Sequence, residues 1–534
     1  MRKTLALVLC LILAFSVVAC TEKPVDEDVE NSPAVTGSAE PNENVDAPGE
    51  EAISEGGTLV VAVSAESDSM LVTQVRSTVI NMWPIFEGLF KFDSTGAAVP
   101  FLVESYEEDL ENLTYTLHLR QGILFHDGSE LTGEVVKWNL ENYMENGILK
   151  SFLASIASVE VTDTYTVVLH LSEWDSQLPA SLARQMGYMA SKEAYDTNGE
   201  EWCASNPVGT GPFKFQSWEQ GVKMTYVRFD EYWQGKPHLD GVEFVVYTTD
   251  LVTQGSMEAG EVHVWQAKDY NIAREMEAEG FSIISSNIPQ VVYNLYYECM
   301  NEDDPFSNLL VRQAASYAID PQVISDSLLN GFGIVTNQFA TPGSPYYSED
   351  VVGYPYNPEK AKELLAEAGY SDGFDTTMVV WNSPAYVNAA AIMQEQLAAV
   401  GIRVELTLVD LAGFVVLMDG WENGMFFHPM GISNGPAPQI ASMFVQGLES
   451  GAGAHSLLHP DDVNALIQSA KSGSLEESCQ DFRDAAKLIW EDYCMLKSFV
   501  AIPSVTVVSS NVADCGIGVD SSFSADLWDT YFVA

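Results

Sequence analysis

Acidic and imidazole side chains are the groups in this sequence that could do chemistry, and they form no recognisable metal or nucleotide motif. The chain holds 76 Asp and Glu, 8 His and 7 Cys residues. It has no H-E-x-x-H zinc motif, no Walker A loop and no G-x-G-x-x-G between a strand and a helix. With so many carboxylates, the spacing of any two of them does not indicate a glycosidase. We therefore expect no enzyme and no cofactor.

Two histidines stand at the spacing that a helix would need to bring them to one metal ion. His455 and His459 are four residues apart. Gly451 and Gly453 precede them and Pro460 follows, which favours a loop over a helix. From the sequence, a metal site and an exposed loop pair both stay open, and the loop is the favoured interpretation.

The cysteines indicate neither a zinc framework nor a dense disulfide scaffold, because no two of them form a C-x-x-C pair. Five lie beyond the N-terminal segment: Cys203, Cys299, Cys479, Cys494 and Cys515. Since five is odd, at least one stays unpaired in any intramolecular scheme. We favour buried structural thiols.

The composition is that of a large and strongly acidic globular protein. The 534 residues are 47% hydrophobic, which suits two or three domains with buried cores. Only 24 Lys and Arg residues oppose the acidic ones, so the net charge is -52. A field of that sign repels phosphate backbones, and we expect no binding to nucleic acid.

The N-terminus has the pattern of a secretory signal. Arg2 and Lys3 are followed by an uncharged stretch over 4–19, which ends in two valines and an alanine before Cys20. This junction resembles the bacterial lipobox, in which the Cys is acylated and becomes the mature N-terminus. The resemblance implies a lipoprotein, with residues 1–20 as signal peptide and Cys20 as the lipidated, palmitate-bearing residue. A plain signal peptide cut near Cys20 is the alternative.

Residues 21–57 have the composition of a disordered tether. They contain 11 acidic residues, one Lys and no aromatic residue. Such a segment cannot bury enough apolar surface to fold, and its like charges keep it extended. A tether between a lipid anchor and a globular body would place the protein on the cell membrane, facing the extracellular side or the periplasm.

Beyond the tether, apolar patterns of two different periods predict strands and helices. We expect strands at 58–63, 113–120, 164–171, 376–381 and 402–408. Asn357 and Pro358 have the types typical of an N-cap and a first helical position, and Gly369 would end that helix. A second helix is expected from about Asn388 to Gly401. Helix-then-strand units of this kind predict an α/β protein.

Five blocks, in order, resemble the family 5 extracellular solute-binding proteins of bacterial ABC importers. They are Phe86-Glu-Gly-Leu-Phe90 with Pro100 and Val103-Glu-Ser105; Leu119-Arg-Gln-Gly122 with Phe125-His-Asp-Gly128 and Leu131-Thr-Gly-Glu-Val135; Val208-Gly-Thr-Gly-Pro-Phe213 with Phe229-Asp-Glu-Tyr-Trp233 and Gly235-Lys-Pro237; Val311-Arg-Gln-Ala314 with Tyr317-Ala-Ile-Asp320; and Asn357-Pro-Glu-Lys-Ala361 with Ala368-Gly-Tyr370.

The residues of these blocks have structural explanations, so the blocks indicate the fold and do not identify a ligand. Asp127-Gly128 is a turn signal after the strand at 113–120. Gly209 and Gly211 suit a tight loop where the chain enters another lobe. Arg312, on a predicted helix, is expected to pair with one of the many carboxylates.

The resemblance implies an α/β, periplasmic-binding-protein-like fold: two lobes around a cleft, with an extra domain inserted in the first lobe. Placed on this chain, lobe I takes 58–87, 189–285 and 505–534, the extra domain takes 88–188, and lobe II takes 286–504. A small solute would bind in the cleft, and hinge bending would bury it.

The resemblance also implies a function. The protein would be a substrate-binding lipoprotein that captures an oligopeptide or similar solute and delivers it to an ABC permease and its ATPase. We expect a monomer whose partners are a small solute, those transporter subunits, and the membrane through its lipid anchor.

Peptide-binding members of the family hold the ligand's amino terminus with an Asp in a Gly-Trp-x-x-Asp-like stretch of lobe II. The matching stretch, 430–438, has no carboxylate and no Trp, and Asn434 stands near the expected position. An amide supplies a hydrogen bond but no charge, so this stretch gives less support to a peptide amino terminus than the family pattern would.

Other candidates for the cleft come from position and chemistry. Aromatic rings bury much area and can cover peptide side chains or stack on sugars. For each residue taken singly, packing in the core is the alternative. The candidates are Trp83, Trp265, Gln266, Trp381, Asn382, Tyr386 and His428, together with Asn434.

Three functions stay open from the sequence. The favoured one is a receptor for import of a peptide or similar solute, with an oligosaccharide as a possible cargo. The second is a receptor for nickel or a metallophore that uses His428, His455 or His459. The third is a surface sensor, adhesin or chaperone on the same fold, because fold does not fix function.

Overall fold

The structure is a computed structural model. It describes residues 53–533 apart from 68, 76–79, 287, 290, 432–435, 449–450, 452 and 519–524. Cys20 and Asn434 therefore lie outside the described residues. No helix of the described part is both long and apolar enough to cross a bilayer.

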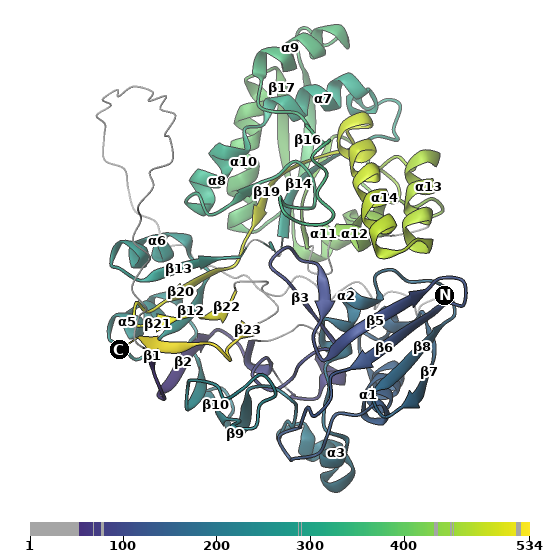
Figure 1. The fold of residues 1–534 in the computed structure, drawn as a ribbon. Coiled ribbons are helices and arrows are strands. Elements are labelled where there is room, and N and C mark those ends of the chain that lie inside the picture. The colour runs from purple at the N-terminus through teal and green to yellow at the C-terminus, as the bar shows by residue number, and fades with distance from the viewer. Residues whose placement is uncertain are drawn as a thin grey trace, which may run out of the picture.

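The first lobe, lobe I, is built on a seven-stranded sheet (Figure 1). Its order is β13 (Ser282–Ser285), β20 (Val505–Val508), β12 (Val264–Ala267), β2 (Thr58–Val63), β11 (Gly241–Val246), β10 (Lys223–Arg228) and β9 (Phe213–Glu219). Strand β2 is parallel to β11 and β12, and β20 is antiparallel to β12 and β13. Helices α5 (Asp250–Glu258) and α6 (Tyr270–Ala278) supply core residues to one face.

The second lobe, lobe II, is built on a six-stranded sheet covered by helices (Figure 1). The strand order is β15 (Ile334–Val335), β19 (Leu496–Ile502), β14 (Val291–Tyr297), β18 (Met425–Gly431), β16 (Phe374–Trp381) and β17 (Ile402–Val409). Its helices are α7 (Leu309–Ala318), α8 (Pro321–Leu329), α9 (Pro358–Glu367), α10 (Pro384–Ala398), α11 (Leu411–Leu417), α12 (Pro436–Phe444), α13 (Asp461–Ser472) and α14 (Leu475–Lys487).

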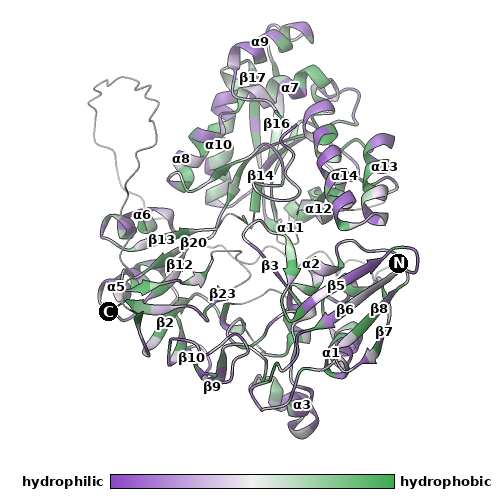
Figure 2. Ribbon diagram, in the orientation of Figure 1, coloured by the Kyte–Doolittle hydropathy of each residue, from purple (hydrophilic) through white to green (hydrophobic). Residues whose placement is uncertain are grey.

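The extra domain has its own four-stranded antiparallel sheet and its own core. The sheet order is β5 (Val103–Asp109), β6 (Thr114–Leu119), β8 (Thr166–Leu171) and β7 (Ile156–Asp163). Helices α1 (Gly133–Asn146) and α2 (Leu178–Leu182) and the hairpin β3 (Phe90–Phe92)–β4 (Ala98–Pro100) complete it, and α3 (Lys192–Asn198) and α4 (Glu200–Cys203) follow. Figure 2 shows apolar strands inside the sheets and hydrophilic residues on outer helices such as α9 and α13.

The alternating patterns of the sequence locate these strands well. Strand β2 has the expected bounds, and β6 and β8 begin one and two residues later than expected. Asn357 caps α9, with its side chain accepting a hydrogen bond from the Lys360 N–H. Helix α10 begins at Pro384, four residues before the expected Asn388, because Pro suits a first helical position.

Two expectations were wrong. Arg312 lies on α7 but pairs with no carboxylate of the described residues: its guanidinium donates to the carbonyls of Phe306, Ser307, Tyr493 and Cys494. The predicted tether also ran too far. Ile53–Ser54 form strand β1, which pairs with β24 (Tyr531–Val533), and β24 in turn pairs with β21 (Val512–Ala513). Residues 53–57 therefore belong to the folded body.

The chain crosses between the two lobes twice, and the crossings lie together. The first leads from β13 to β14 and the second from β19 to β20. The Ser286 N–H donates to the Ser504 carbonyl across them, at 3.1 Å. Beside the crossings, the Arg274 guanidinium of α6 donates to the Asn330 carbonyl at 3.1 Å and lies 3.7 Å from the centroid of the Phe332 ring.

Besides the crossings from lobe I, lobe II contacts the extra domain, through residues 174–177 just before α2. The Trp174 Nε1–H donates to the Gly473 carbonyl between α13 and α14, at 2.6 Å. The Ser176 hydroxyl bonds the Ala470 carbonyl and the Ser478 hydroxyl, both at 3.1 Å. Lobe II is thus held both at the crossings and by the extra domain.

Candidate ligand-binding site

The topology brings one edge of each lobe's sheet to the crossings. In lobe I the parallel strands β2, β11 and β12 end at Val63, Val246 and Ala267, and Ala267 pairs with the first residue of β20. In lobe II, Gly431 at the end of β18 pairs with Val291 at the start of β14. The carboxyl ends of parallel strands are the usual place for ligands in open α/β sheets. The candidate site is therefore the space between these two edges.

Three of the predicted residues meet at the lobe II edge. Trp381 is the last residue of β16, is half-buried, and stacks on Tyr386 with ring centroids 5.2 Å apart. Tyr386 lies edge-on to Tyr293 at 5.7 Å, and burial raises its pKa to about 12. Asn382 is exposed and its backbone N–H donates to the Val409 carbonyl. Asn382 directly follows Trp381 in the sequence, and its side chain is open to solvent.

His428 lies inside the lobe II sheet and not at its edge. Its ring is buried, stacks on Phe414 at 5.2 Å, and lies edge-on to Tyr296 at 6.0 Å. Neither ring nitrogen has a hydrogen-bond partner within the described residues. Burial without a partner lowers the pKa of His428 to about 4. This imidazole is neutral near pH 7 and packs as an aromatic core residue.

The predicted residues of lobe I fall on both faces of its sheet. Trp265 is buried on the face that packs against α5 and α6, next to Met257 and Met276. Gln266 points to the other face, one residue before β12 ends, and its buried Nε2 atom has no partner in the described part of the chain. Trp83 is buried in the core on that second face, and its indole N–H is also without a partner there.

The described residues contain no group of three or more His, Cys, Asp or Glu side chains that could hold a metal ion. His455 is exposed and His459 half-buried, and both lie outside helices. All five cysteines of the body are free thiols and buried. Asn434, the position expected near a peptide amine, cannot be placed because residues 432–435 are outside the described part.

The stretch from Gly431 to Gly435 also reads Gly-Ile-Ser-Asn-Gly, the G-x-S-x-G pattern of a hydrolase nucleophile turn. It lies between β18 and α12, a strand and a helix as that pattern requires. The pattern also requires a His with a hydrogen-bonding partner. The nearby His428 has no such partner among the described residues. The match therefore carries no catalytic assignment.

A polar cluster that the sequence did not predict lies in lobe I, where the chain enters the extra domain after Glu87. The buried Glu87 carboxylate accepts hydrogen bonds from the hydroxyls of Tyr232 at 2.6 Å and Thr210 at 2.7 Å. The Trp233 indole N–H donates to it as well, at 3.1 Å. Burial nevertheless raises the pKa of Glu87 to about 7. The first and third of the resemblance blocks thus meet at one structural junction.

The same junction explains the glycines of the Val208–Phe213 block. A Cβ at Gly209 would lie 2.1 Å from the Ile85 carbonyl oxygen, and one at Gly211 would lie 2.4 Å from that of Pro84. The Gly211 N–H donates to the Ile85 carbonyl at 2.8 Å. Only a residue without a side chain allows this close approach of two backbones.

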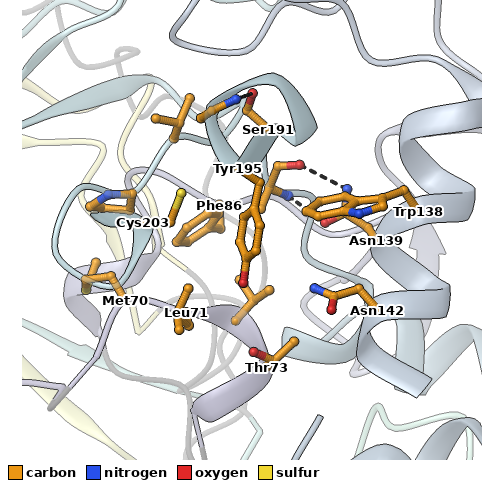
Figure 3. A pocket seen from close by; sticks show the side chains of 15 residues that line it. Met70, Leu71, Thr73, Phe86, Trp138, Asn139, Asn142, Ser191, Tyr195 and Cys203 are labelled. Atoms are coloured by element: carbon orange, nitrogen blue, oxygen red, sulfur yellow. Dashed lines mark hydrogen bonds between the residues drawn. The ribbon is translucent and has the colours of Figure 1, made fainter. Parts of the chain in front are cut away.

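A small pocket opens beside this junction, where the Tyr195 ring points inward and Trp138 lies edge-on to it at 5.0 Å (Figure 3). The volume is about 20 Å³, enough for a water molecule but not for a solute. Other lining residues include Phe86, Asn139 and Cys203. This pocket is a packing defect and not the ligand site.

The family profile for bacterial extracellular solute-binding proteins, family 5 (middle region), matches residues 97–452. The chain belongs to this family. The glutathione-binding protein GsiB of Salmonella paratyphi A is 29% identical over 460 residues, which cover 83% of this chain and 88% of that protein. The GsiB protein of Pectobacterium atrosepticum is 30% identical over 443 residues, covering 80% and 83%.

Solved structures share the two-lobed fold. The unliganded open form of the murein tripeptide-binding protein MppA matches with a TM-score of 0.79 and 16% identity, covering 91% of this chain and 99% of that one. DppA from Helicobacter pylori, in complex with the peptide STSA, matches with a TM-score of 0.64 and 23% identity, covering 90% and 99%. The fold expected from the resemblance, two α/β lobes, is confirmed.

Proposed function

We propose that this protein captures short peptides between the facing edges of its two lobes and delivers them to an ABC permease and its ATPase. One observation carries the proposal: in both lobes, the carboxyl ends of the parallel strands lie next to the crossings. The chain also belongs to family 5. Relatives support the ligand class, because GsiB is named for glutathione and the DppA structure holds a peptide.

The proposed division of the body is lobe I at 53–87, 189–285 and 505–534, the extra domain at 88–188, and lobe II at 286–504. Two crossings that lie together form a hinge about which lobe II can turn. The TM-score of 0.79 to an open form, against 0.64 to a peptide complex, supports an open state. A ligand that contacts both lobes would favour the closed state by its differential affinity.

The test is a melting experiment on the purified protein with a tryptic digest of casein as the probe. A peptide at a hundred times its Kd adds about 2.7 kcal/mol of stability. We expect a clear rise in melting temperature with the digest. The control is the same digest hydrolysed fully to amino acids, which should produce no rise. A folded protein that does not respond to the digest would contradict the proposal.

We also propose that Cys20 carries the lipid anchor and that residues 21–52 form the tether. Two acyl chains hold a protein to a membrane stably, at ~0.8 kcal/mol for each buried CH₂ group. The Cys20→Ser variant should leave the membrane fraction and enter the medium or the periplasm. Retention of that variant on membranes after a salt wash would overturn the lipobox interpretation.

A further inference from the structure

Lobe I and the extra domain are bonded into one body, so a contact between the extra domain and lobe II spans the hinge. The His126 N–H donates to the Gly209 carbonyl, and the His126 ring bonds the Gly211 carbonyl, both at 2.9 Å. The Ser191 hydroxyl at the start of α3 donates to the Asp127 carboxylate of the extra domain. The crossings therefore separate two bodies: lobe I with the extra domain, and lobe II.

Buried hydrogen bonds join these two bodies at a place remote from the crossings. We call this contact the latch: residues 174–177 of the extra domain with Ala470, Gly473 and Ser478 of lobe II. Ser176 is 2% exposed and Ser478 is completely buried. Figure 1 shows α13 and α14 at the right of lobe II, whereas β13 and β20, which lead into the crossings, lie at the left.

Gln177 extends the latch to a further segment of lobe II. Its amide nitrogen donates to the Ser478 hydroxyl at 3.4 Å, and its amide oxygen accepts from the Tyr346 hydroxyl at 3.0 Å. Tyr346, on the loop between β15 and α9, packs against the lobe II core. On the other side, Trp174 stacks on Tyr115 in the core of the extra domain, with ring centroids 4.7 Å apart. Both halves of the latch are thus held by the cores of their own domains.

A turn of lobe II about the crossings would break these bonds. Hydrogen bonds weaken steeply outside a narrow range of distance and angle. A rotation displaces each residue in proportion to its distance from the axis, and α13 and α14 lie on the side of lobe II away from the crossings (Figure 1). The carbonyls of Ala470 and Gly473 would then leave their donors. The latch therefore stabilises the arrangement of the lobes described here relative to any other.

We propose that the latch holds lobe II in the open arrangement and that a ligand must break it to close the lobes. The inference rests on the proposed function and adds to it the contact that opposes closure. The apparent affinity of a ligand falls with the fraction of molecules able to adopt the binding-competent state. The latch thus lowers the affinity for every ligand, although none of its residues needs to touch one.

The first experiment locks the latch with a disulfide. The hydroxyl oxygens of Ser176 and Ser478 lie 3.1 Å apart, which makes the pair suitable for such a bond. In the double variant Ser176→Cys with Ser478→Cys, diamide oxidises the two thiols to a disulfide, which peptide mapping by mass spectrometry identifies. The oxidised protein should lose its rise in melting temperature with the casein digest. Reduction with tris(2-carboxyethyl)phosphine should restore the rise.

The second experiment weakens the latch. Ser176→Ala removes the bonds to the Ala470 carbonyl and the Ser478 hydroxyl. Calorimetry with a peptide recovered from the digest should show an affinity about two- to tenfold higher than that of the wild type, which corresponds to one neutral hydrogen bond. The ligand-free melting temperature should fall at the same time. A hydroxyl with only a structural role would lower the melting temperature and leave the affinity unchanged.

Ser325→Ala is the matched control. The Ser325 hydroxyl is buried and donates to the Gly333 carbonyl at 3.0 Å, but both residues belong to lobe II. This variant should lower the ligand-free melting temperature by an amount similar to that of Ser176→Ala. Its affinity for the peptide should equal that of the wild type.

The outcomes separate the two proposals. If the wild type responds to the digest and the oxidised double variant responds in full, the latch is overturned and the proposed function stands. The same conclusion follows if Ser176→Ala binds the peptide no more tightly than the wild type. If the double variant does not fold or forms no disulfide, Ser176→Ala decides alone. No response in the wild type overturns the proposed function and, with it, the role of the latch in ligand binding.

Discussion

At the lobe II edge aromatic rings contact one another, whereas at the lobe I edge buried polar atoms stand without partners. The lobe II rings contact one another: Trp381 stacks on Tyr386, and Tyr386 meets Tyr293 edge-on. Aromatic side chains of this kind present a large apolar area and few polar atoms. Gln266 and Thr506 offer hydrogen bonds and little area. The two edges therefore differ in chemistry: the lobe II edge is formed by aromatic rings, and the lobe I edge holds buried polar atoms.

The two sides also hold buried titratable groups of opposite kinds. His428 in lobe II is neutral because burial favours its uncharged form, and no donor or acceptor within the described residues contacts its ring nitrogens. Glu87, on the side of lobe I, keeps three hydrogen-bond donors and still binds its proton more tightly than a free Glu. The stabilities of the two sides should therefore respond to pH in opposite directions.

The largest effect is expected at His428 in acid. Its folded pKa of about 4 lies below the ordinary histidine value of 6.5, so the unfolded chain binds more protons as the pH falls through this range. Stability present above pH 6.5 is lost toward pH 4, by roughly 3 kcal/mol for this group. His428→Phe should remove that loss, measured by urea unfolding at pH 7 and pH 5. An unchanged pH dependence would contradict the buried neutral imidazole.

A second buried histidine limits this experiment and provides its control. His126 in the extra domain is also held at a pKa of about 4 by burial, but its Nε2–H donates to the Gly211 carbonyl. His428→Phe should therefore remove only about half of the acid sensitivity that the two histidines cause. His126→Phe should lower stability at pH 7 as well, because the Gly211 carbonyl would lose its donor.

Glu87 should produce an opposite slope of similar or slightly smaller size. Its folded pKa of about 7 lies above the ordinary glutamate value of 4.5, so between these two pH values the folded chain holds a proton that the unfolded chain has lost. Its contribution is complete below pH 4.5 and is lost as the pH rises through 7, by up to roughly 3 kcal/mol. Glu87→Gln should remove this loss, so the variant gains stability relative to the wild type as the pH rises from 5 to 8. A pH dependence identical to that of the wild type would show that the Glu87 carboxyl is ionised in the folded and the unfolded chain alike.

Much of the fold was predictable because it depends on local periodicity. Strand β2 and the N-cap of α9 are set by residues a few positions apart, and both were found. The partners of Glu87 lie 123 and 145 residues away, and those of Arg312 up to 182 residues away. A single sequence contains no signal for contacts between residues so far apart along the chain. The prediction that Arg312 pairs with a carboxylate was therefore wrong.

Residues of the candidate site could be predicted only where the position of a residue at the end of a strand determines whether its side chain is exposed. Trp381 is the last residue of β16 and Asn382 follows it, so the structure places both at the lobe II edge. Trp265 and Gln266 are neighbours and point to opposite faces, so the pattern named both when only one can face that space.

A smaller effect on stability is expected from Trp381→Ala. Truncation of a large buried aromatic costs about 3–5 kcal/mol, and a half-buried ring should cost about 2 kcal/mol. The peptide response should also fall, because the apolar surface of the lobe II edge is reduced. Trp202→Ala is the matched control: its ring is 40% exposed and lies on α4, away from the lobe II edge. A normal peptide response in Trp381→Ala would remove this ring from the site.

The smallest effect on stability is expected from Asn382→Ala. The side chain is exposed, and the hydrogen bond to the Val409 carbonyl comes from the backbone, which the substitution retains. The free energy of unfolding should change by less than about 0.5 kcal/mol. If the amide contacts the peptide, loss of one neutral hydrogen bond costs about 0.5–1.5 kcal/mol, or roughly two- to tenfold in affinity. Calorimetry with a peptide recovered from the casein digest measures this change. A variant with wild-type stability and wild-type affinity would show that the lobe II edge binds through its rings alone, and the contrast with lobe I would become sharper.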